Sequence, residues 1–293
     1  MNKNEKVFQA FLIVLLAVIC FLILFPLILV ISASLSTEAN LAQFGYTMLP
    51  KEFSLAGYKY VFNNPAAVFN AYKVTFTFSV ITTLVGTFLM ALVAYPLSKS
   101  DLRGKGAISF YLYFTMLFNG GLVPTYILIT QYLKLGDTIW VYILPCLISP
   151  WYVFMIRTFF KSIPEAICES AYIDGAGEFR VFLTIMLPLS KPVLSTVALF
   201  VFLASWNNWY TSMLYINDNS LVSLQYLLQR IMRDIDILQR EQGLTQNLIN
   251  IVDIPAETAR MAMAMVVAGP ALLVFPFFQK YFVKGLTVGG VKG

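Results

Sequence analysis

The stretch 169–188, "ESAYIDGAGEFRVFLTIMLP", sets the interpretation of the rest of the chain. Its first twelve residues hold four ionised side chains and two glycines. Long apolar blocks precede and follow it, and an apolar block of about 20 residues can cross a bilayer as a helix. A concentration of charge between two such blocks predicts a loop at a membrane surface.

The composition of the whole chain is that of a membrane protein. Of its 293 residues, 59% are hydrophobic and 12% are charged, whereas about a quarter of the residues in a soluble domain are charged. Segments that cross lipid must be helical, because lipid offers no partner to an unpaired backbone amide. We therefore expect an all-α membrane protein. The basic residues behind the net charge of +5 lie at segment ends, which indicates membrane topology rather than nucleic-acid binding.

Six apolar blocks predict one transmembrane domain over residues 1–293. The first block is expected to remain as an anchor, because its apolar run is longer than the core of a signal peptide. Prolines inside several blocks predict kinks that neighbouring helices compensate. The predicted spans are 8–31, 74–97, 107–131, 138–160, 189–215 and 259–282.

Lysine and arginine set the predicted orientation. The short loop 98–106 contains Lys99, Arg103 and Lys105, and cytoplasmic loops are enriched in such residues. Both termini are therefore expected on the cytoplasmic side, with the long segment 216–258 outside.

The outer segment 216–258 contains a row of apolar residues at helical spacing. We expect an amphipathic helix that packs against a partner or closes the outer mouth of the protein. A solvated connector is the alternative. The residues of this row are Leu227, Ile231, Ile235 and Leu238.

The loop 161–188 has the signals of two short helices joined by a turn. Ser162 and Glu165 have the spacing of a capping box, with Pro164 at an early helical position. The first helix is expected to run from Pro164 to about Asp174 and to end at Gly175, which readily adopts a left-handed conformation. A second helix is expected to start near Glu178 and to break at Pro188.

The first of these helices has features that favour docking into a cleft. Glu165 and Glu169 lie one turn apart, and like charges at this spacing repel slightly when left alone. Ala166 and Ser170 form a row of small residues that lets another surface approach closely. An ordinary capped loop with solvated acids is the alternative.

No catalytic residue or metal site is expected on this chain. It has no histidine, and Cys20, Cys146 and Cys168 are far apart in or near apolar segments, so we interpret them as small core residues. The sequence "RGKGAI" lacks the flanking residues of a phosphate-binding loop.

The stretch 169–188 resembles the EAA loop of permease subunits of bacterial ABC importers, with Ser170 as the one departure. The tail 279–293, "QKYFVKGLTVGGVKG", resembles that of the second permease subunit of the maltose and multiple-sugar group. The stretch 118–129, "FNGGLVPTYILI", resembles a branch that serves oligosaccharides derived from plants or polysaccharides. The residues that match the loop pattern are Glu169, Ala171, Asp174, Gly175, Ala176, Phe182, Ile185, Leu187 and Pro188.

The resemblance implies a type I ABC importer permease with six transmembrane helices and cytoplasmic coupling helices. It implies a subunit of the bacterial inner membrane that is not itself an enzyme. Its partners would be a homologous permease, two ATPase subunits that bind ATP and magnesium, an extracellular solute-binding protein and a carbohydrate. No cofactor is expected on this chain.

The resemblance also implies roles for two sets of residues. The coupling loop would transmit motion from the ATPase through Glu165, Glu169, Ser170, Ala171, Asp174, Gly175 and Ala176. The cytoplasmic tail 283–293 would contact the ATPase through Gly285, Leu286, Thr287, Gly289 and Gly290.

Two polar stretches inside the spans are candidates for a carbohydrate path. Polar residues in a span usually face the bundle interior or a water-filled path, and sugars need hydrogen-bonding groups together with flat aromatic faces. An aromatic belt is the alternative for the stretch in the fifth span, and close helix packing is the alternative for the one in the third. The candidates are Asn119 in the third span and Trp206, Asn207, Asn208, Trp209 and Tyr210 in the fifth.

Two other functions remain open on the sequence. A permease for amino acids, peptides or phosphate would share the loop, although the tail argues against it. A membrane scaffold or membrane-embedded enzyme would use segment 216–258, and it would need a catalytic constellation that we do not find.

Overall fold

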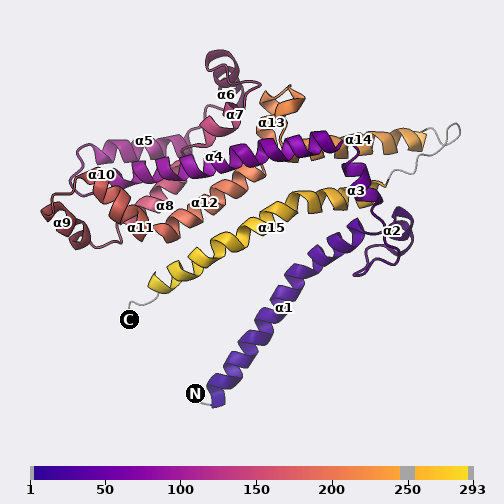
Figure 1. Ribbon diagram of the computed structural model, residues 1–293, viewed down its shortest axis with the longest axis horizontal. Helices are drawn as coiled ribbons and strands as arrows, with labels where there is room; N and C mark the ends of the chain where they lie inside the picture. The colour runs from indigo at the N-terminus through magenta and orange to yellow at the C-terminus, as the bar shows by residue number, and fades with distance from the viewer. Residues whose placement is uncertain (1–2, 245–254, 290–293) are drawn as a thin grey trace. The chain divides into compact units, whose positions relative to one another are not determined.

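The computed structural model describes residues 3–244 and 255–289, and these residues are predominantly helical (Figure 1). Within them, the one β-type feature is an isolated antiparallel bridge between Ser36 and Phe53. The chain divides into two compact units: residues 1–65 with 228–270, and residues 66–227 with 271–293. The predicted all-α architecture is thus confirmed for the described residues.

The first unit contains three helices near the N-terminus and parts of two later ones. The predicted span 8–31 lies inside the first of them, α1, whose apolar side chains are mostly exposed. An apolar and exposed surface of this length suits contact with lipid. The helices are α1 (Lys3–Ser34), α2 (Glu38–Phe44), α3 (Ala56–Val61), most of α14 (Leu224–Leu244) and the start of α15 (Ala256–Gly289).

The beginning of α15 is capped by Glu38 of α2. Glu38 Oε1 accepts a hydrogen bond from the Glu257 N–H at 3.0 Å, and Oε2 accepts from the Thr258 N–H at 3.1 Å. The first N–H groups of a helix have no partner within the helix, and the helix dipole favours negative charge there. Gly57 of α3 lies against the same turn, since a Cβ on it would be 2.5 Å from the Thr258 carbonyl oxygen.

The predicted amphipathic helix of the outer segment is α14. Ile235 is fully buried and Ile231 is half-buried, as the apolar row predicts, whereas Leu238 is 40% exposed. Arg260 of α15 is paired with Asp236 and donates to the Gln239 Oε1 atom at 3.2 Å. The buried row therefore ends at Ile235, and ionic contacts continue the packing beyond it.

The second unit is built around the 34-residue helix α4 (Pro65–Ser98). Its other helices are shorter, and several follow one another with hardly a break. They are α5 (Lys105–Leu117), α6 (Leu122–Ile127), η1 (Leu128–Tyr132), α7 (Trp140–Ile143), η2 (Leu144–Cys146), α8 (Pro150–Phe160), α9 (Glu165–Ile173), α10 (Glu178–Val181), η3 (Phe182–Met186), α11 (Leu187–Leu189), α12 (Lys191–Trp206), α13 (Tyr210–Tyr215) and η4 (Asn219–Leu221).

Among the described residues, three helices are long and apolar enough to cross a membrane: Val7–Ser34, Pro65–Ser98 and Ala256–Val274. Three bent pairs pass the same criteria if each pair is one span. Their bends are 110° between α5 and α6–η1, 47° between α7–η2 and α8, and 80° between Glu178–Leu189 and α12. Length and composition thus allow three to six spans, and the count of six stays a prediction.

Two breaks inside the predicted spans lie where local hydrogen bonds replace helical ones. In the third predicted span, Gly121 has a φ of +88° and its N–H donates to Asn119 Oδ1 at 2.8 Å. In the fifth, α12 ends at Trp206, and Asn208 Oδ1 accepts from the Thr211 N–H at 3.1 Å as α13 begins. The predicted span 189–215 is therefore two helices.

The last helix, α15, continues beyond the predicted end of its span at 282. Its backbone is helical to Gly289, so Gly285, Leu286, Thr287 and Gly289 of the predicted tail lie on this helix. Gly290 and the rest of the tail lie outside the described residues.

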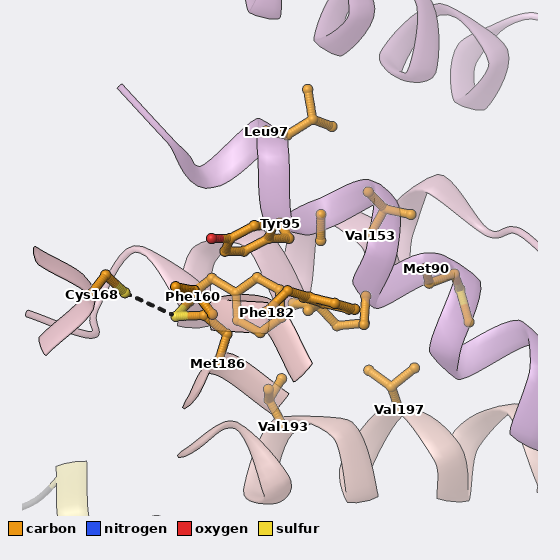
Figure 2. Close-up of a cluster of buried hydrophobic side chains, with 14 of the residues drawn as sticks. Met90, Tyr95, Leu97, Val153, Phe160, Cys168, Phe182, Met186, Val193 and Val197 are labelled. Carbon is orange, nitrogen blue, oxygen red and sulfur yellow. Dashed lines mark hydrogen bonds between the residues drawn. The ribbon is translucent and has the colours of Figure 1, made fainter. Parts of the chain in front are cut away.

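Two apolar clusters form the core of the second unit. The first is centred on Tyr95, Phe160 and Phe182, with the Tyr95 and Phe182 ring centroids 5.2 Å apart (Figure 2). In the second, Phe78 and Tyr142 stack with their centroids 4.4 Å apart. Burial of such rings is a large apolar contribution to stability. The first cluster includes residues of the stretch 169–188.

Candidate functional site

The predicted coupling loop begins with α9, which starts one residue after Pro164. Pro164 has an extended ψ of 130°, and no side chain caps the helix. Ser162 Oγ instead donates to the Phe159 carbonyl at 2.7 Å, back toward α8. The predicted capping box is therefore wrong, because the extended Pro164 leaves Ser162 too far upstream to reach the first helical N–H groups. The extent of the helix is as predicted.

The end of α9 is a Schellman motif with Gly175 at its left-handed position. Gly175 has a φ of +79°. Its N–H donates to the Tyr172 carbonyl at 3.0 Å, and the Ala176 N–H donates to the Ala171 carbonyl at 2.9 Å. Both bonds satisfy carbonyl groups that a helix end leaves open, and the geometry requires a positive φ at the glycine. The predicted helix stop at Gly175 is confirmed.

The two faces of α9 have different surroundings. On the inner face, Cys168 is buried and its Sγ donates to Met186 Sδ at 3.7 Å (Figure 2). On the outer face, Glu165 and Glu169 are exposed, and Ile173 is 87% exposed. A helix that is anchored on one side and offers acids and a bare isoleucine on the other suits contact with a second protein.

The second helix of the loop starts at Glu178, as predicted. It continues as α10, η3 and α11 to Leu189, so Pro188 lies within its last turn. The break falls at Ser190, where the chain turns into α12. The π-helical segment η3 directly precedes α11, and a local π adjustment can satisfy the backbone group that a proline frees within a helix. The predicted break at Pro188 is therefore two residues early.

A group of four polar side chains joins the coupling loop to the end of α4, and the sequence did not predict it. Glu178 Oε2 accepts hydrogen bonds from Tyr95 Oη and, at 2.8 Å, from Tyr172 Oη. Lys99 Nζ donates to Tyr172 Oη at 2.7 Å and lies 4.0 Å from Glu178 Oε2. Burial acts to lower the pKa of Lys99, but the hydrogen bond with Tyr172 and the charge of Glu178 outweigh it, so the pKa is raised.

A groove of about 600 Å³ is lined by three of these four residues, Tyr95, Lys99 and Glu178. Its walls include Pro96 of α4, Asp101 and Arg103 of the following loop, and Phe179 of α10. Charges of both signs meet apolar surface here, so the groove has no strong preference for either charge. It leaves one side of the polar group open.

A second cavity, of about 390 Å³, brings together two of the predicted path residues. Asn119 from the break before α6 and Tyr210 from the start of α13 both line it. Thr125 and Thr211 add hydroxyl groups, and Ile129 adds apolar surface. A cavity with a few polar groups on apolar walls is the usual form of a small-molecule site.

Asp137 ties together the two segments that border this cavity. Its Oδ1 accepts from the Asp218 N–H at 2.9 Å and from the Asn217 N–H, and its own N–H donates to the Tyr215 carbonyl at 3.0 Å. The N–H groups of Asp218 and Asn217 hold the pKa of this carboxyl below its usual range. The loop before α7 is thereby fixed to the loop after α13.

The other predicted path residues lie elsewhere. Trp206 is 2% exposed, between the rings of Tyr72 and Phe202. Asn207 and Asn208 both bond to backbone groups. Asn207 Nδ2 donates to the Leu203 carbonyl at 2.9 Å, and Asn208 Oδ1 accepts from the Thr211 N–H.

Trp209 is half-buried and packs edge-on against Tyr210, with the ring centroids 5.7 Å apart. Of the path residues predicted in the fifth span, Tyr210 is the one that lines the cavity with Asn119. The role of all these residues in a path stays a prediction.

The comparisons with known proteins extend over nearly the whole chain, although no protein-family model matches it. Protein LplC of Bacillus subtilis is 38% identical over 292 residues, which are 100% of this chain and 97% of that protein. The polygalacturonan/rhamnogalacturonan transport system permease protein YtcP of the same organism is 38% identical over 277 residues, 94% of each chain.

A solved structure also matches this chain. It is a bacterial ABC transporter involved in the import of the acidic polysaccharide alginate, and its matching chain is 26% identical with a TM-score of 0.79. The match covers 96% of this chain and 99% of that one. Full-length identity, the shared helical fold and the anchored loop agree: this chain belongs to the permease subunits of carbohydrate ABC importers.

Proposed function

We propose that this chain is the transmembrane subunit of an ATP-driven importer that takes up an oligosaccharide delivered by an extracellular binding protein. The observation that supports this most is 38% identity to the polygalacturonan/rhamnogalacturonan transport system permease protein YtcP over 94% of this chain, and to LplC over 100% of it. A second, homologous permease would complete the path. Two cytoplasmic ATPase subunits would bind ATP with magnesium, and this chain would have no ATPase site of its own.

The coupling loop would be the contact with the ATPase. Its first helix, α9, is held from behind by Cys168 and Tyr172, and its exposed face carries Glu165, Glu169 and Ser170. A helix fixed in this way transmits a displacement instead of absorbing it. This assignment places the loop, the end of α15 and both termini on the cytoplasmic side of the inner membrane.

The test of the proposed function is uptake by the complete importer reconstituted in proteoliposomes with its binding protein. We expect ATP-dependent uptake of oligosaccharides and none of amino acids, peptides or phosphate. Uptake of one of those solutes instead would favour the permease for a non-sugar solute. Purification with no associated ATPase would favour the scaffold.

Substitution of Glu169 by alanine should weaken the contact with the ATPase. A hydrogen bond to a charged group contributes about 1.5–3 kcal/mol, so uptake and co-purification of the ATPase should each fall about tenfold or more. Asp101→Asn is the control, because Asp101 is an exposed acid in a different cytoplasmic loop. Equal behaviour of the two variants would contradict a docking role for Glu169.

The cavity between α6 and α13 is the proposed part of the sugar path on this chain. Tyr210→Ala or Asn119→Ala removes one polar or aromatic contact, and the loss of one hydrogen bond corresponds to about a two- to tenfold loss of affinity. We expect a KM for uptake raised by that factor, with unchanged levels in the membrane. The control is Tyr132→Ala, since Tyr132 is 77% exposed on η1. A wild-type KM in both cavity variants would exclude this cavity from the path.

A further inference from the structure

We propose that Tyr95, Lys99, Tyr172 and Glu178 form a polar clamp through which the coupling loop moves α4. The proposal rests on the proposed function, because a clamp of this kind has a role in transport only if α9 docks on an ATPase. In this view the four are positioning residues. They hold the loop and the span in one geometry, and they contact neither the sugar nor ATP.

The clamp joins both sides of the Schellman turn to the same helix. Tyr172 lies before the turn on α9, and Glu178 is the first residue of α10 after it. Each is hydrogen-bonded to the end of α4: Tyr172 to Lys99 at 2.7 Å, and Glu178 to Tyr95. A displacement of α9 or of α10 therefore pulls on the last turn of α4, which is a 34-residue helix and one of the three long spans.

The clamp is separable from the packing that keeps the loop folded. The Tyr95 ring lies in the first apolar cluster, beside Phe160 and Phe182 (Figure 2). That packing remains when only the hydroxyl or the charge of a clamp residue is removed. The side chain of Glu178 is 63% exposed, so solvent weakens its ion pair with Lys99 and limits what the pair adds to stability. The hydrogen bonds of the clamp mainly fix the orientation of the loop relative to the end of α4.

The geometry also explains why two tyrosines serve here in place of aliphatic residues. Each phenol combines a ring that packs in or against the first apolar cluster with a hydroxyl that donates to Glu178. Glu178 Oε2 receives both hydroxyls, and Lys99 Nζ donates to one of them. One carboxylate oxygen thus links α4, α9 and α10 at a single point, and the open groove beside it lets this point shift without displacing packed side chains.

The test measures uptake and ATP hydrolysis in the same vesicles for the whole importer. Tyr172→Phe and Glu178→Gln keep shape and packing while removing a donor or the charge. We expect the amount of sugar taken up per ATP hydrolysed to fall about fivefold or more. A factor of about five is the lower end of the effects that coupling between distant sites produces. The amount of assembled complex should stay at the wild-type value. Lys99→Arg should retain most of the ratio and Lys99→Met should not.

The controls separate this proposal from its competitors. Asp101→Asn, in the same groove but outside the clamp, should keep the wild-type ratio. The double variant Tyr172→Phe with Glu178→Gln should be no worse than the poorer single one if the four residues act as a unit.

Two results would overturn the clamp. One is uptake and hydrolysis that both stay at their wild-type rates in every clamp variant, and the other is an equal fall of the two rates, which would indicate a structural role only; in both cases the ratio stays at the wild-type value. Gly175→Val is measured alongside. If it loses uptake while the clamp variants keep the ratio, the clamp alone is wrong; if it also transports normally, the coupling role of the loop is wrong.

Discussion

Substitution of Gly175 by valine is expected to abolish sugar uptake while the protein remains in the membrane at its normal level. Gly175 has a φ of +79°, and the two hydrogen bonds that end α9 depend on it. A non-glycine residue in this conformation costs about 1–2 kcal/mol, and a β-branched one is among the worst. The turn would open, and α9 would no longer present its exposed face in the direction set by Cys168 and Tyr172.

The loop itself supplies the matched control for this prediction. Gly177 lies two residues away with an ordinary φ of −75°, and a Cβ there meets nothing within 4 Å. A Cβ on Gly175 also meets nothing within 4 Å, so the difference between the two sites is the backbone conformation. Gly177→Ala should transport normally, and Gly175→Asn should be milder than valine, since asparagine tolerates this conformation. Uptake by vesicles is the measurement, and normal uptake by Gly175→Val would contradict the prediction.

The sequence predicted the features that depend on neighbouring residues. The end of α9 at Gly175 follows from bonds between residues a few positions apart. Apolar length likewise predicted the three long helices α1, α4 and α15, but not that the other three predicted spans are divided into shorter helices. The capping box failed for an equally local reason, since the pattern Ser-x-x-Glu does not report that Pro164 is extended.

The sequence could not predict the contacts between distant residues. Tyr95 and Glu178 are 83 positions apart, and Lys99 and Tyr172 are 73 apart. One signal was available, because Tyr95 lies in the last turn of α4 and Lys99 directly follows the end of this helix. Nothing in their spacing identified the loop as the partner.

The aromatic and amide residues 206–210 show a second limit of prediction from sequence. Composition alone cannot distinguish an amide that faces a cavity from one that satisfies backbone groups. In the structure Asn208 bonds to the Thr211 N–H, and Trp206 is buried by Tyr72 and Phe202. Only Tyr210 of this cluster lies at the cavity with Asn119. The difference arises from where the helix breaks, which packing across the unit decides.

Substitution of Gly57 by alanine is expected to destabilise the corner formed by α2, α3 and α15. A Cβ on Gly57 would lie 2.5 Å from the Thr258 carbonyl oxygen and 2.6 Å from its carbon. Both are backbone atoms, so no side chain can rotate away and the helices must separate. Overpacking of this kind costs about 1–3 kcal/mol and sometimes more. Separation would also lengthen the hydrogen bonds of Glu38 to the Glu257 and Thr258 N–H groups.

The thermal unfolding of purified protein in detergent, followed by circular dichroism, measures the effect. A loss of 1 kcal/mol lowers the Tm of a large domain by about 2–4 °C, so a loss of about 1–3 kcal/mol should lower the Tm by about 2–12 °C. Gly106→Ala is the control, because Gly106 is an exposed helical glycine whose Cβ would meet nothing within 4 Å. It should leave the Tm unchanged or raise it slightly, since alanine favours the helix. If Gly57→Ala unfolded at the same temperature as Gly106→Ala, α3 could not lie as close to α15 as the Gly57 contact requires.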